Sequence, residues 1–294
     1  ARIYEGEPVF MEKVFGPLVK EKFFFNVSGR YIYIDGWLRG QRRYTPSNIG
    51  YTDSTGRFVE SRDASALGNN AFVPMNWNRK KYGQAKLIYN LRSSMKLTNT
   101  TIWDDVEYQD YDRFYVYNPD GNLNKFRQGF TDILKLTHTL SNRTFYDLAL
   151  SYTEKFFQQY VYEDQHDPRY VHPQLSTAPA FSFGTGGASL QHFNRRTSTA
   201  LAKLDLTSQV NNQHQFKAGV EMRRYRLFFE DINLQPVREQ ADFNPARSSP
   251  FIQTRVPGLD EDGHNRFTHR PIEISGYAQD KIELKDFIVN IGVR

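Results

Sequence analysis

The sequence predicts an all-β protein, an antiparallel transmembrane β-barrel of which the chain supplies a part. Two observations favour this fold. Long segments alternate apolar and polar residues with a period of two, which places one set on each face of a strand. These segments come in pairs joined by very short turns, and long loops separate the pairs. Short periplasmic turns and long extracellular loops are typical of an outer-membrane barrel.

The clearest pair of segments covers residues 127–158. Leu134 and Leu136 alternate with polar residues, a tight turn follows at 141–143, and the alternation resumes around Leu148. Each segment exceeds the roughly 9–11 residues with which a tilted strand crosses a bilayer. This pair therefore predicts a membrane-spanning hairpin.

The other segments bring the expected total to about nine or ten strands. Residues 1–22 are poorly patterned, and we expect one inward strand there at most. Further strands are expected at residues 23–33, 84–91, 95–112, 197–207, 216–223, 271–283 and 287–294.

Tight turns are expected near residues 92–94, 141–143, 210–212 and 285, and long loops at 35–79, 113–126, 159–192 and 231–269. Because connections between successive antiparallel strands alternate sides, the turns should share one rim and the loops the other. One loop centres on Asn118-Pro119-Asp120-Gly121. Pro119 fixes φ there, and Gly121 is expected to accept a positive φ.

The charges predict which face of each strand meets lipid, because a midplane Lys or Arg on that face costs about 2–4 kcal/mol. The lipid face is expected to carry Leu134, Leu136, Leu148, Leu150, Ala202, Leu204, Ala218 and Val220. The lumen face is expected to carry Lys135, Asp147, Lys203, Asp205, Lys217 and Glu221. Such a charged lumen wall suits either a polar translocation path or a static network that holds a plug.

The composition excludes several classes of protein. The 294 residues contain no run of about 18 apolar residues, so a transmembrane helix is excluded. The absence of cysteine excludes disulfides, thiolate zinc sites and a cysteine nucleophile. The net charge of +5 is compatible with nucleic acid or anionic lipid, but the basic residues are dispersed, which argues against a nucleic-acid surface. An aromatic content of 15% suits the girdles at both membrane interfaces.

Both ends of the chain look cut. The first residue is Ala1, no signal peptide is evident, and Arg294 ends the chain inside a strand pattern. We expect residues 1–294 to be part of one barrel domain whose signal peptide, plug domain and C-terminal strands lie outside this chain.

Two parts of the sequence resemble a known family. Residues 23–31 read FFFNVSGRY, residues 275–283 read SGYAQDKIE, and residues 287–294 read FIVNIGVR. These segments resemble barrel strands of TonB-dependent receptors of the outer membrane, in the subgroup with an N-terminal carboxypeptidase-regulatory-like domain. The resemblance implies a barrel of about 22 strands with a plugged lumen, of which this chain looks like the N-terminal part. It also implies energy from the inner membrane through TonB.

Two groups of side chains are candidates for ligand binding at the exterior. The first is an aromatic and charged stretch that consists of Tyr108, Tyr111, Arg113, Tyr115 and Tyr117. The alternative for this stretch is the outer aromatic girdle. The second group, in a predicted loop, consists of Asp164, His166 and His172. Solvated charges are ordinary in such a loop, which is the alternative reading of this group.

No catalytic motif is present. The sequence contains neither G-x-S-x-G nor a P-loop. Asp260-Glu261-Asp262-Gly263 lacks the spaced ligands of an EF-hand. We therefore expect no enzyme activity, no cofactor and no metal site.

Basic residues gather where strands should emerge at the exterior, among them Arg195, Arg196, Arg224 and Arg226. The outer leaflet is built from phosphorylated glycolipids, and arginine pairs well with phosphate. The hypothesis is a lipopolysaccharide-binding belt made by those arginines that point outward. The alternative is that they point inward and pair with loop carboxylates. Because strand faces alternate, only part of the set can serve the belt.

The pattern and the resemblance together predict an outer-membrane receptor or transporter of a Gram-negative bacterium that binds a ligand for TonB-energised import. The expected partners are membrane lipids, lipopolysaccharide, the TonB system through a missing N-terminal region, and surface or periplasmic proteins, but no nucleic acid. A scaffolding barrel that anchors surface proteins is one alternative. A soluble carbohydrate-binding β-domain is another.

Overall fold

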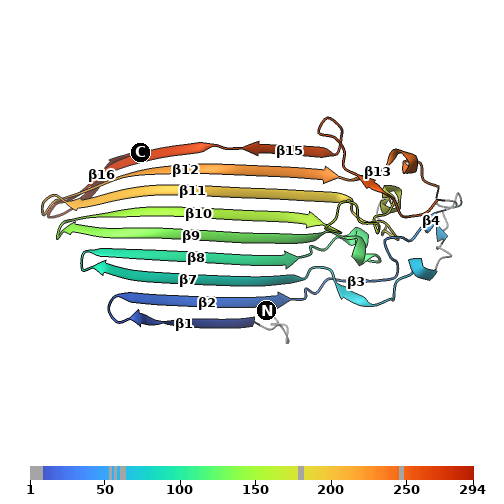
Figure 1. Ribbon diagram of the computed structural model, residues 1–294, viewed down its shortest axis with the longest axis horizontal. Helices are drawn as coiled ribbons and strands as arrows, with labels where there is room; N and C mark the ends of the chain where they lie inside the picture. Colours follow the sequence, from blue (N-terminus) through green and yellow to red (C-terminus); the bar gives the residue numbers. More distant parts are fainter. Residues whose placement is uncertain (1–8, 53–54, 56–57, 60–63, 178–181, 245–247) are drawn as a thin grey trace.

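One antiparallel sheet of 11 strands dominates the structure (Figure 1). The computed structural model describes residues 9–294 except 53–54, 56–57, 60–63, 178–181 and 245–247. The sheet order is β1-β2-β7-β8-β9-β10-β11-β12-β16-β17, with β15 paired beside β12. Neighbours in the sheet are thus successive long strands of the chain. The predicted fold class is confirmed, and β1 and β17 are the edges of an open sheet within the described residues.

The strands of the large sheet are β1 (Val9–Val19), β2 (Phe23–Ile34), β7 (Asn78–Arg92), β8 (Met95–Tyr108), β9 (Asn124–Ser141), β10 (Thr144–Tyr160), β11 (Gln191–Gln209), β12 (His214–Asn233), β15 (His264–His269), β16 (Ile272–Glu283) and β17 (Ile288–Val293). The connections contain the short strands β3 (Arg39–Gln41), β4 (Tyr51–Thr52), β5 (Phe58–Val59), β6 (Phe72–Pro74), β13 (Gln235–Pro236) and β14 (Thr254–Arg255). They also contain the 3-10 turns η1 (Ala64–Ala66), η2 (Arg113–Tyr115), η3 (Pro119–Gly121), η4 (Pro173–Ser176) and η5 (Arg238–Gln240). The described residues include no helix with the length and apolar character to span a membrane.

All the tight turns lie at one end of the sheet and all the long loops at the other, as predicted (Figure 1). The strand bounds differ from the expectation in several places. β8 ends at Tyr108, whereas β11 starts at Gln191 and β12 continues to Asn233. The expected loop at 231–269 was too long, because β15 lies within it and pairs with β12. β1 lies within the expected residues 1–22, of which 1–8 lie outside the described part.

The strand pairing separates the sheet into two chemically distinct faces. Directly paired residues of antiparallel strands point to the same side. Leu148 pairs with Leu136 and Leu204, and Leu204 pairs with Val220, so these residues share what we call the outer face. Asp147 pairs with Asp205, and Lys203 pairs with Glu221, on the opposite inner face. The pairing confirms that the eight predicted lipid-face residues share one face and the six predicted lumen residues share the other.

The outer face has the dimensions of a membrane-spanning surface. Aromatic side chains flank its apolar band on both sides. Toward the long loops they are Trp103, Phe130, Phe156 and Phe228, and toward the short turns Phe23, Tyr89, Tyr146 and Phe216. From Tyr146 to Phe156 along β10, ten residues rise about 34 Å, which a tilt of about 40° reduces to about 26 Å, close to the usual apolar height of about 25 Å. Side chains on this face are also the more exposed, for example Val220, Met222 and Arg224 against Glu221 and Arg223.

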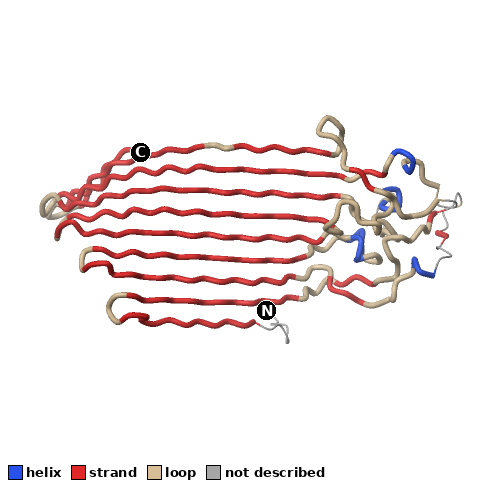
Figure 2. Tube along the Cα trace, viewed as in Figure 1, coloured by secondary structure: helices blue, strands red, loops and turns tan. Residues whose placement is uncertain are grey.

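The long loops fold together into a layer with its own hydrophobic core at the extracellular end of the sheet (Figure 2). The buried members of this core are Val161, Tyr170, Val171, Leu175, Ala188, Leu190, Ile232, Leu234 and Ile252. Backbone hydrogen bonds tie separate loops to each other, such as Gln41 to Val116 (2.8 Å) and Ile252 to Tyr170 (3.0 Å). The loops therefore build a packed cap over the strand ends.

The turn around Gly121 differs from its prediction. Among the described residues the glycines with positive φ are Gly187 and Gly263, so Gly121 is not one of them. Gly121 is instead required by close packing, because a Cβ there would lie 2.4 Å from the carbonyl oxygen of Gly187. The same carbonyl accepts a hydrogen bond of 2.7 Å from the amide of Asn118. This contact joins the β8–β9 loop to the β10–β11 loop.

Candidate ligand-binding site at the extracellular mouth

Four phenylalanine rings form a ladder across the inner face where the strands reach the loops. They come from neighbouring strands: Phe157 from β10, Phe193 from β11, Phe229 from β12 and Phe267 from β15. The ring centroids of Phe157 and Phe193 lie 5.6 Å apart, those of Phe193 and Phe229 5.1 Å, and those of Phe229 and Phe267 4.8 Å. These separations are typical of attractive aromatic pairs. The ladder is a continuous aromatic strip on the face that also carries the lumen charges.

Arg195 adds a positive charge to one end of the ladder. Its guanidinium carbon lies 5.7 Å from the ring centroid of Phe157, and the side chain is exposed. Within the described part of the chain Arg195 forms no ion pair. On the same face, Arg127 lies opposite Phe157, and its guanidinium lies 3.8 Å from Asp104. The mouth therefore offers a cation that has no ion-pair partner among the described residues, beside an aromatic strip.

Polar groups border the ladder on the loop side. Gln159 donates to the side-chain oxygen of Gln191 (2.8 Å), and Gln191 donates to Asp231 (2.9 Å). These three side chains satisfy one another across β10, β11 and β12, which fixes their orientation. The border is therefore a rigid polar edge to the aromatic strip.

The predicted aromatic stretch is spread over the loop layer, and the structure does not bring it together as one platform. Tyr108 ends β8 on the inner face, with the ammonium of Lys125 5.9 Å from its ring. Tyr111 is exposed, whereas Tyr115 is buried, and burial raises the pKa of Tyr115 to about 12. Arg113 and Tyr117 both contact the ring of Phe183. The guanidinium carbon of Arg113 lies 5.1 Å from the centroid of that ring, and the ring centroids of Tyr117 and Phe183 are also 5.1 Å apart.

The predicted loop group serves the architecture of the cap. Asp164 accepts a hydrogen bond from the backbone of His166 (2.9 Å), and Nδ1 of His166 contacts the carbonyl oxygen of Thr254 (3.0 Å). His172 is buried, caps η4 by accepting from Gln174 (3.3 Å), and stacks on Phe243 with centroids 4.6 Å apart. The described residues contain no group of three or more His, Cys, Asp or Glu that could hold a metal ion.

The four arginines of the predicted belt divide between the two faces. Arg195 lies on the inner face with the ladder. Arg196, Arg224 and Arg226 lie on the outer face, where they pair with Phe156, Ala200 and Ser198 respectively. Arg196 forms an ion pair with Glu154 of β10.

The ladder itself was missed in the sequence. Its four rings lie in segments that were expected to be loops or strand ends. There the apolar residues lie on the inner face, where the pattern predicts polar residues. The usable signal was the spacing: Phe157 and Phe193 continue the odd-numbered inner positions of Lys155 and Arg195.

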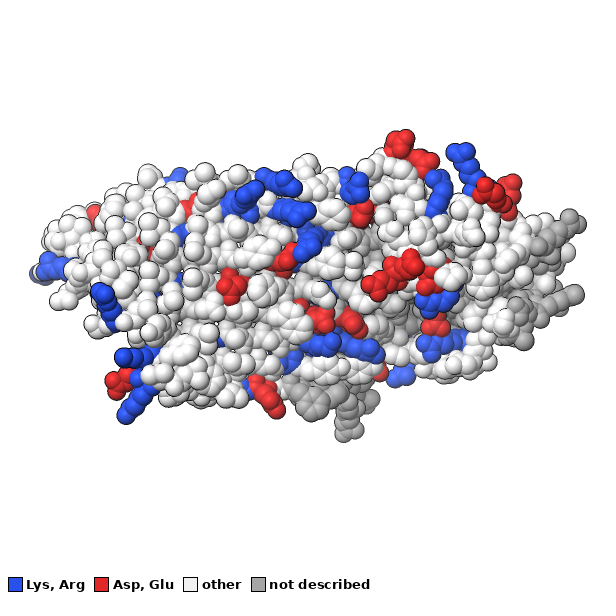
Figure 3. Space-filling view, viewed as in Figure 1, with Lys and Arg blue, Asp and Glu red and all other residues white. Residues whose placement is uncertain are grey.

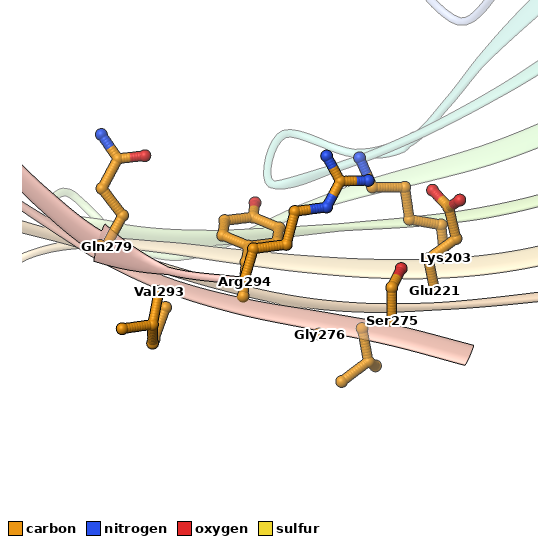
Figure 4. Close-up of a pocket in the computed structure, with 11 residues that line it drawn as sticks. Lys203, Glu221, Ser275, Gly276, Gln279, Val293 and Arg294 are labelled. Atoms are coloured by element: carbon orange, nitrogen blue, oxygen red, sulfur yellow. The ribbon is translucent and has the colours of Figure 1, made fainter. Parts of the chain in front are cut away.

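Farther from the loops the inner face is lined by charges. Lys203 contacts Asp205 at 3.1 Å, and Lys135 contacts Asp147 at 2.9 Å. Figure 4 shows Lys203 and Glu221 on one side of the sheet and Val293 on the other. They line a pocket of about 410 Å³ beside β17, which is a sheet edge in the described residues. An edge strand has unpaired backbone groups with which a further strand can pair, and such a strand would occupy this pocket. We therefore assign no ligand to it.

Comparison with solved structures places this geometry in a known fold. The chain superposes on the outer membrane transporter YddB from Escherichia coli with a TM-score of 0.60 and 13% sequence identity. The match covers 97% of this chain and 33% of that transporter. The chain has the antiparallel β-barrel fold of the matched part of that protein. The chain spans only about a third of the length of that transporter.

Weaker similarity extends to other outer-membrane receptors. The ferric-catecholate import receptor Fiu from E. coli K12 matches at a TM-score of 0.48, with 12% identity over 92% of this chain and 43% of that one. The ferric yersiniabactin uptake receptor FyuA from Yersinia pestis matches at 0.46, with 10% identity over 95% and 43%. No protein-family model and no curated protein sequence matches the chain. The barrel fold, the apolar band and the aromatic girdles agree with the expected location in the outer membrane of a Gram-negative bacterium.

Proposed function

We propose that the chain forms part of the wall of a TonB-dependent transporter that receives a ligand at the Phe157–Phe267 ladder. Arg195 and the ladder are the observation that carries this proposal. They face the lumen at the extracellular end, where an incoming ligand first meets the barrel.

The chemistry of the site favours a ligand with a flat apolar surface and an anionic group. Aromatic contacts contribute about 0.5–1.5 kcal/mol per pair beyond the burial of apolar area. A charge-assisted hydrogen bond from Arg195 to a carboxylate or phosphate is about twice as strong as a neutral one. The charges of Lys203, Asp205 and Glu221 continue along the inner wall below the ladder and suit a polar path for such a ligand.

The remaining parts of the transporter are proposed to lie outside this chain. They are the closing strands, a plug domain, a signal peptide and a TonB-interacting segment. A scaffolding barrel that anchors surface proteins is the alternative. That role does not require an arginine without an ion-pair partner on the lumen face. The soluble carbohydrate-binding alternative is disfavoured by the exposed apolar band of the outer face, which includes Leu150 and Val220.

Uptake by cells that carry the intact protein tests the proposal. The probes are a panel of labelled ferric chelates and oligosaccharides, measured with and without a functional TonB. We expect uptake of at least one probe to require TonB and to fall about tenfold in a Phe193→Ala, Arg195→Gln variant. The matched control is Phe130→Ala with Arg143→Gln, on the outer face and in a short turn.

The control variant is expected to retain full uptake. If no probe enters in a TonB-dependent manner and a surface protein co-purifies with the barrel, the scaffolding alternative is correct. If the ladder variant and the control variant behave alike, transport does not use this site.

A further inference from the structure

Two arginines on the outer face form no close ion pair within the described residues. Arg224 and Arg226 follow one another on that face of β12 and are both exposed. In the part of the chain that the structure describes, neither forms an ion pair. The carboxylates nearest to them on this face are engaged elsewhere: Glu154 with Arg196, and Asp132 with Asn99 (2.9 Å) and Thr101 (2.6 Å).

An apolar groove leads along the outer face to Arg224. Its volume is about 560 Å³. Its floor is the pair of small side chains Ala200 and Ala202 on β11. Its walls are the larger side chains Leu134, Leu150, Tyr152 and Met222, and Asp132 also lines it, in the row of Arg224. Because Ala200 pairs with Arg224 and Ala202 pairs with Met222, the groove starts in the apolar band and ends beside the guanidinium.

The height of this site in the membrane is set by the girdle. Arg224 lies in the same row of paired residues as Tyr152, and Arg226 lies one row farther toward the loops, level with Phe130. Lipid-facing arginine costs about 2–4 kcal/mol at the midplane but only about 0–1 kcal/mol near the interface. Arg226 therefore lies at the loop-side girdle, and Arg224 lies one row inside the apolar band, from where its long side chain can extend toward the headgroups of the outer leaflet. Figure 3 shows a broad uncharged area on the strands, with basic side chains gathered beside it.

We infer that this surface binds lipopolysaccharide, with one acyl chain in the groove over Ala200 and Ala202 and a phosphate between Arg224 and Arg226. Residues i and i+2 of a strand are about 7 Å apart, so two guanidinium groups can share one phosphate or contact adjacent groups of one headgroup. Arg196 stands on the same face one strand away and extends the basic surface. The extracellular end faces the outer leaflet, which selects the phosphorylated glycolipid over a glycerophospholipid of the inner leaflet.

The lipid that stays bound to the purified protein tests this inference. The intact barrel is extracted in mild detergent, and lipopolysaccharide and glycerophospholipid are each quantified per mole of protein by mass spectrometry. We expect Arg224→Gln with Arg226→Gln to lower bound lipopolysaccharide about tenfold or more. The matched control is Lys217→Gln with Arg223→Gln, which removes the same charge from the inner face of the same strand.

A second variant tests the groove without changing charge. Ala202→Phe fills the floor with a side chain that a lipid-facing position tolerates, and it should also lower bound lipopolysaccharide. Folding of each variant is checked by its faster migration on unheated gels. Equal lipopolysaccharide in the outer-face and inner-face variants would overturn the inference, as would wild-type protein that retains glycerophospholipid alone. Bound lipid is measured without uptake, and the outer-face variants leave the ladder and Arg195 unchanged, so the two proposals fail independently.

Discussion

Tyr277 on β16 donates a hydrogen bond of 2.8 Å to the carboxylate of Asp205 on β11, across the whole width of β12. Gly219 of β12 lies between them, paired with both residues. A Cβ at Gly219 would lie 2.5 Å from the Tyr277 ring and 2.6 Å from the Asp205 oxygen. The missing side chain therefore allows two strands that are not neighbours to be linked on the inner face.

Gly219→Ala should destabilise the folded barrel by about 1–3 kcal/mol, because the added methyl group forces Tyr277 and Asp205 apart. The measurement is the denaturant midpoint of unfolding from lipid vesicles. Gly276→Ala is the matched control, since a Cβ there meets nothing closer than 3.5 Å. Similar midpoints for the two variants would show that the Tyr277–Asp205 link does not matter.

Leu204→Arg should weaken insertion by up to about 2–4 kcal/mol, because the side chain lies inside the outer apolar band. Thr207→Arg places the same side chain on the inner face and should be tolerated. The yield of heat-modifiable protein in vesicles measures the difference. If both variants inserted equally well, the two faces would be misassigned.

Tyr170→Phe should loosen the loop cap and leave the barrel intact. The Tyr170 hydroxyl donates to the carbonyl oxygen of Tyr162 (3.1 Å) and then accepts from Nε2 of His192 (2.7 Å). Leaving these buried groups unpaired costs about 1–3 kcal/mol. We expect faster proteolysis within residues 161–190 and an unchanged barrel midpoint. Tyr111→Phe, at an exposed ring, serves as the control and should be cleaved at the wild-type rate.

Alkaline pH should ionise the buried phenol of Tyr115 and loosen the loop cap around it. Burial raises the pKa of Tyr115 from 10.0 to about 12, so the neutral phenol is favoured in the folded state. Its contribution, about 2–3 kcal/mol, is fully present below pH 10 and is lost as the pH rises through about 12. Tyrosinate absorbance of the wild type minus that of Tyr115→Phe reports this titration. A midpoint near 10 would mean that the ring is not buried.

The spanning part of the fold was predictable from the sequence because its two faces differ in a simple way. Leu204 and Lys203 alternate apolar with charged, and a register error of one residue would send Lys203 into lipid. The extracellular ends of the same strands were not predictable. There Phe193 lies on the inner face and Arg196 on the outer face, which reverses the order of apolar and charged residues found in the spanning part. Such a reversal looks like the end of a strand in the sequence.

The packing of the loop cap could not be predicted from the sequence, for a different reason. Its contacts join residues of separate loops, such as His172 with Phe243, and no period marks such pairs. Tyr115 was therefore expected in a binding platform, although it is buried. The division of the arginines was predictable only in part: alternation shows that Arg195 and Arg196 face opposite ways, and the strand pairing shows which one faces the ladder.

The central claim is that this sheet has one face in lipid and the other in a lumen. The chain contains no cysteine, so single cysteines placed from residue 201 to 206 on β11 can carry a fluorophore one position at a time. In vesicles that contain a lipid-borne quencher, the account predicts strong quenching at Ala202, Leu204 and Leu206 and weak quenching at Lys203 and Asp205. Quenching that does not alternate along β11, or that is strongest at Lys203 and Asp205, would contradict it.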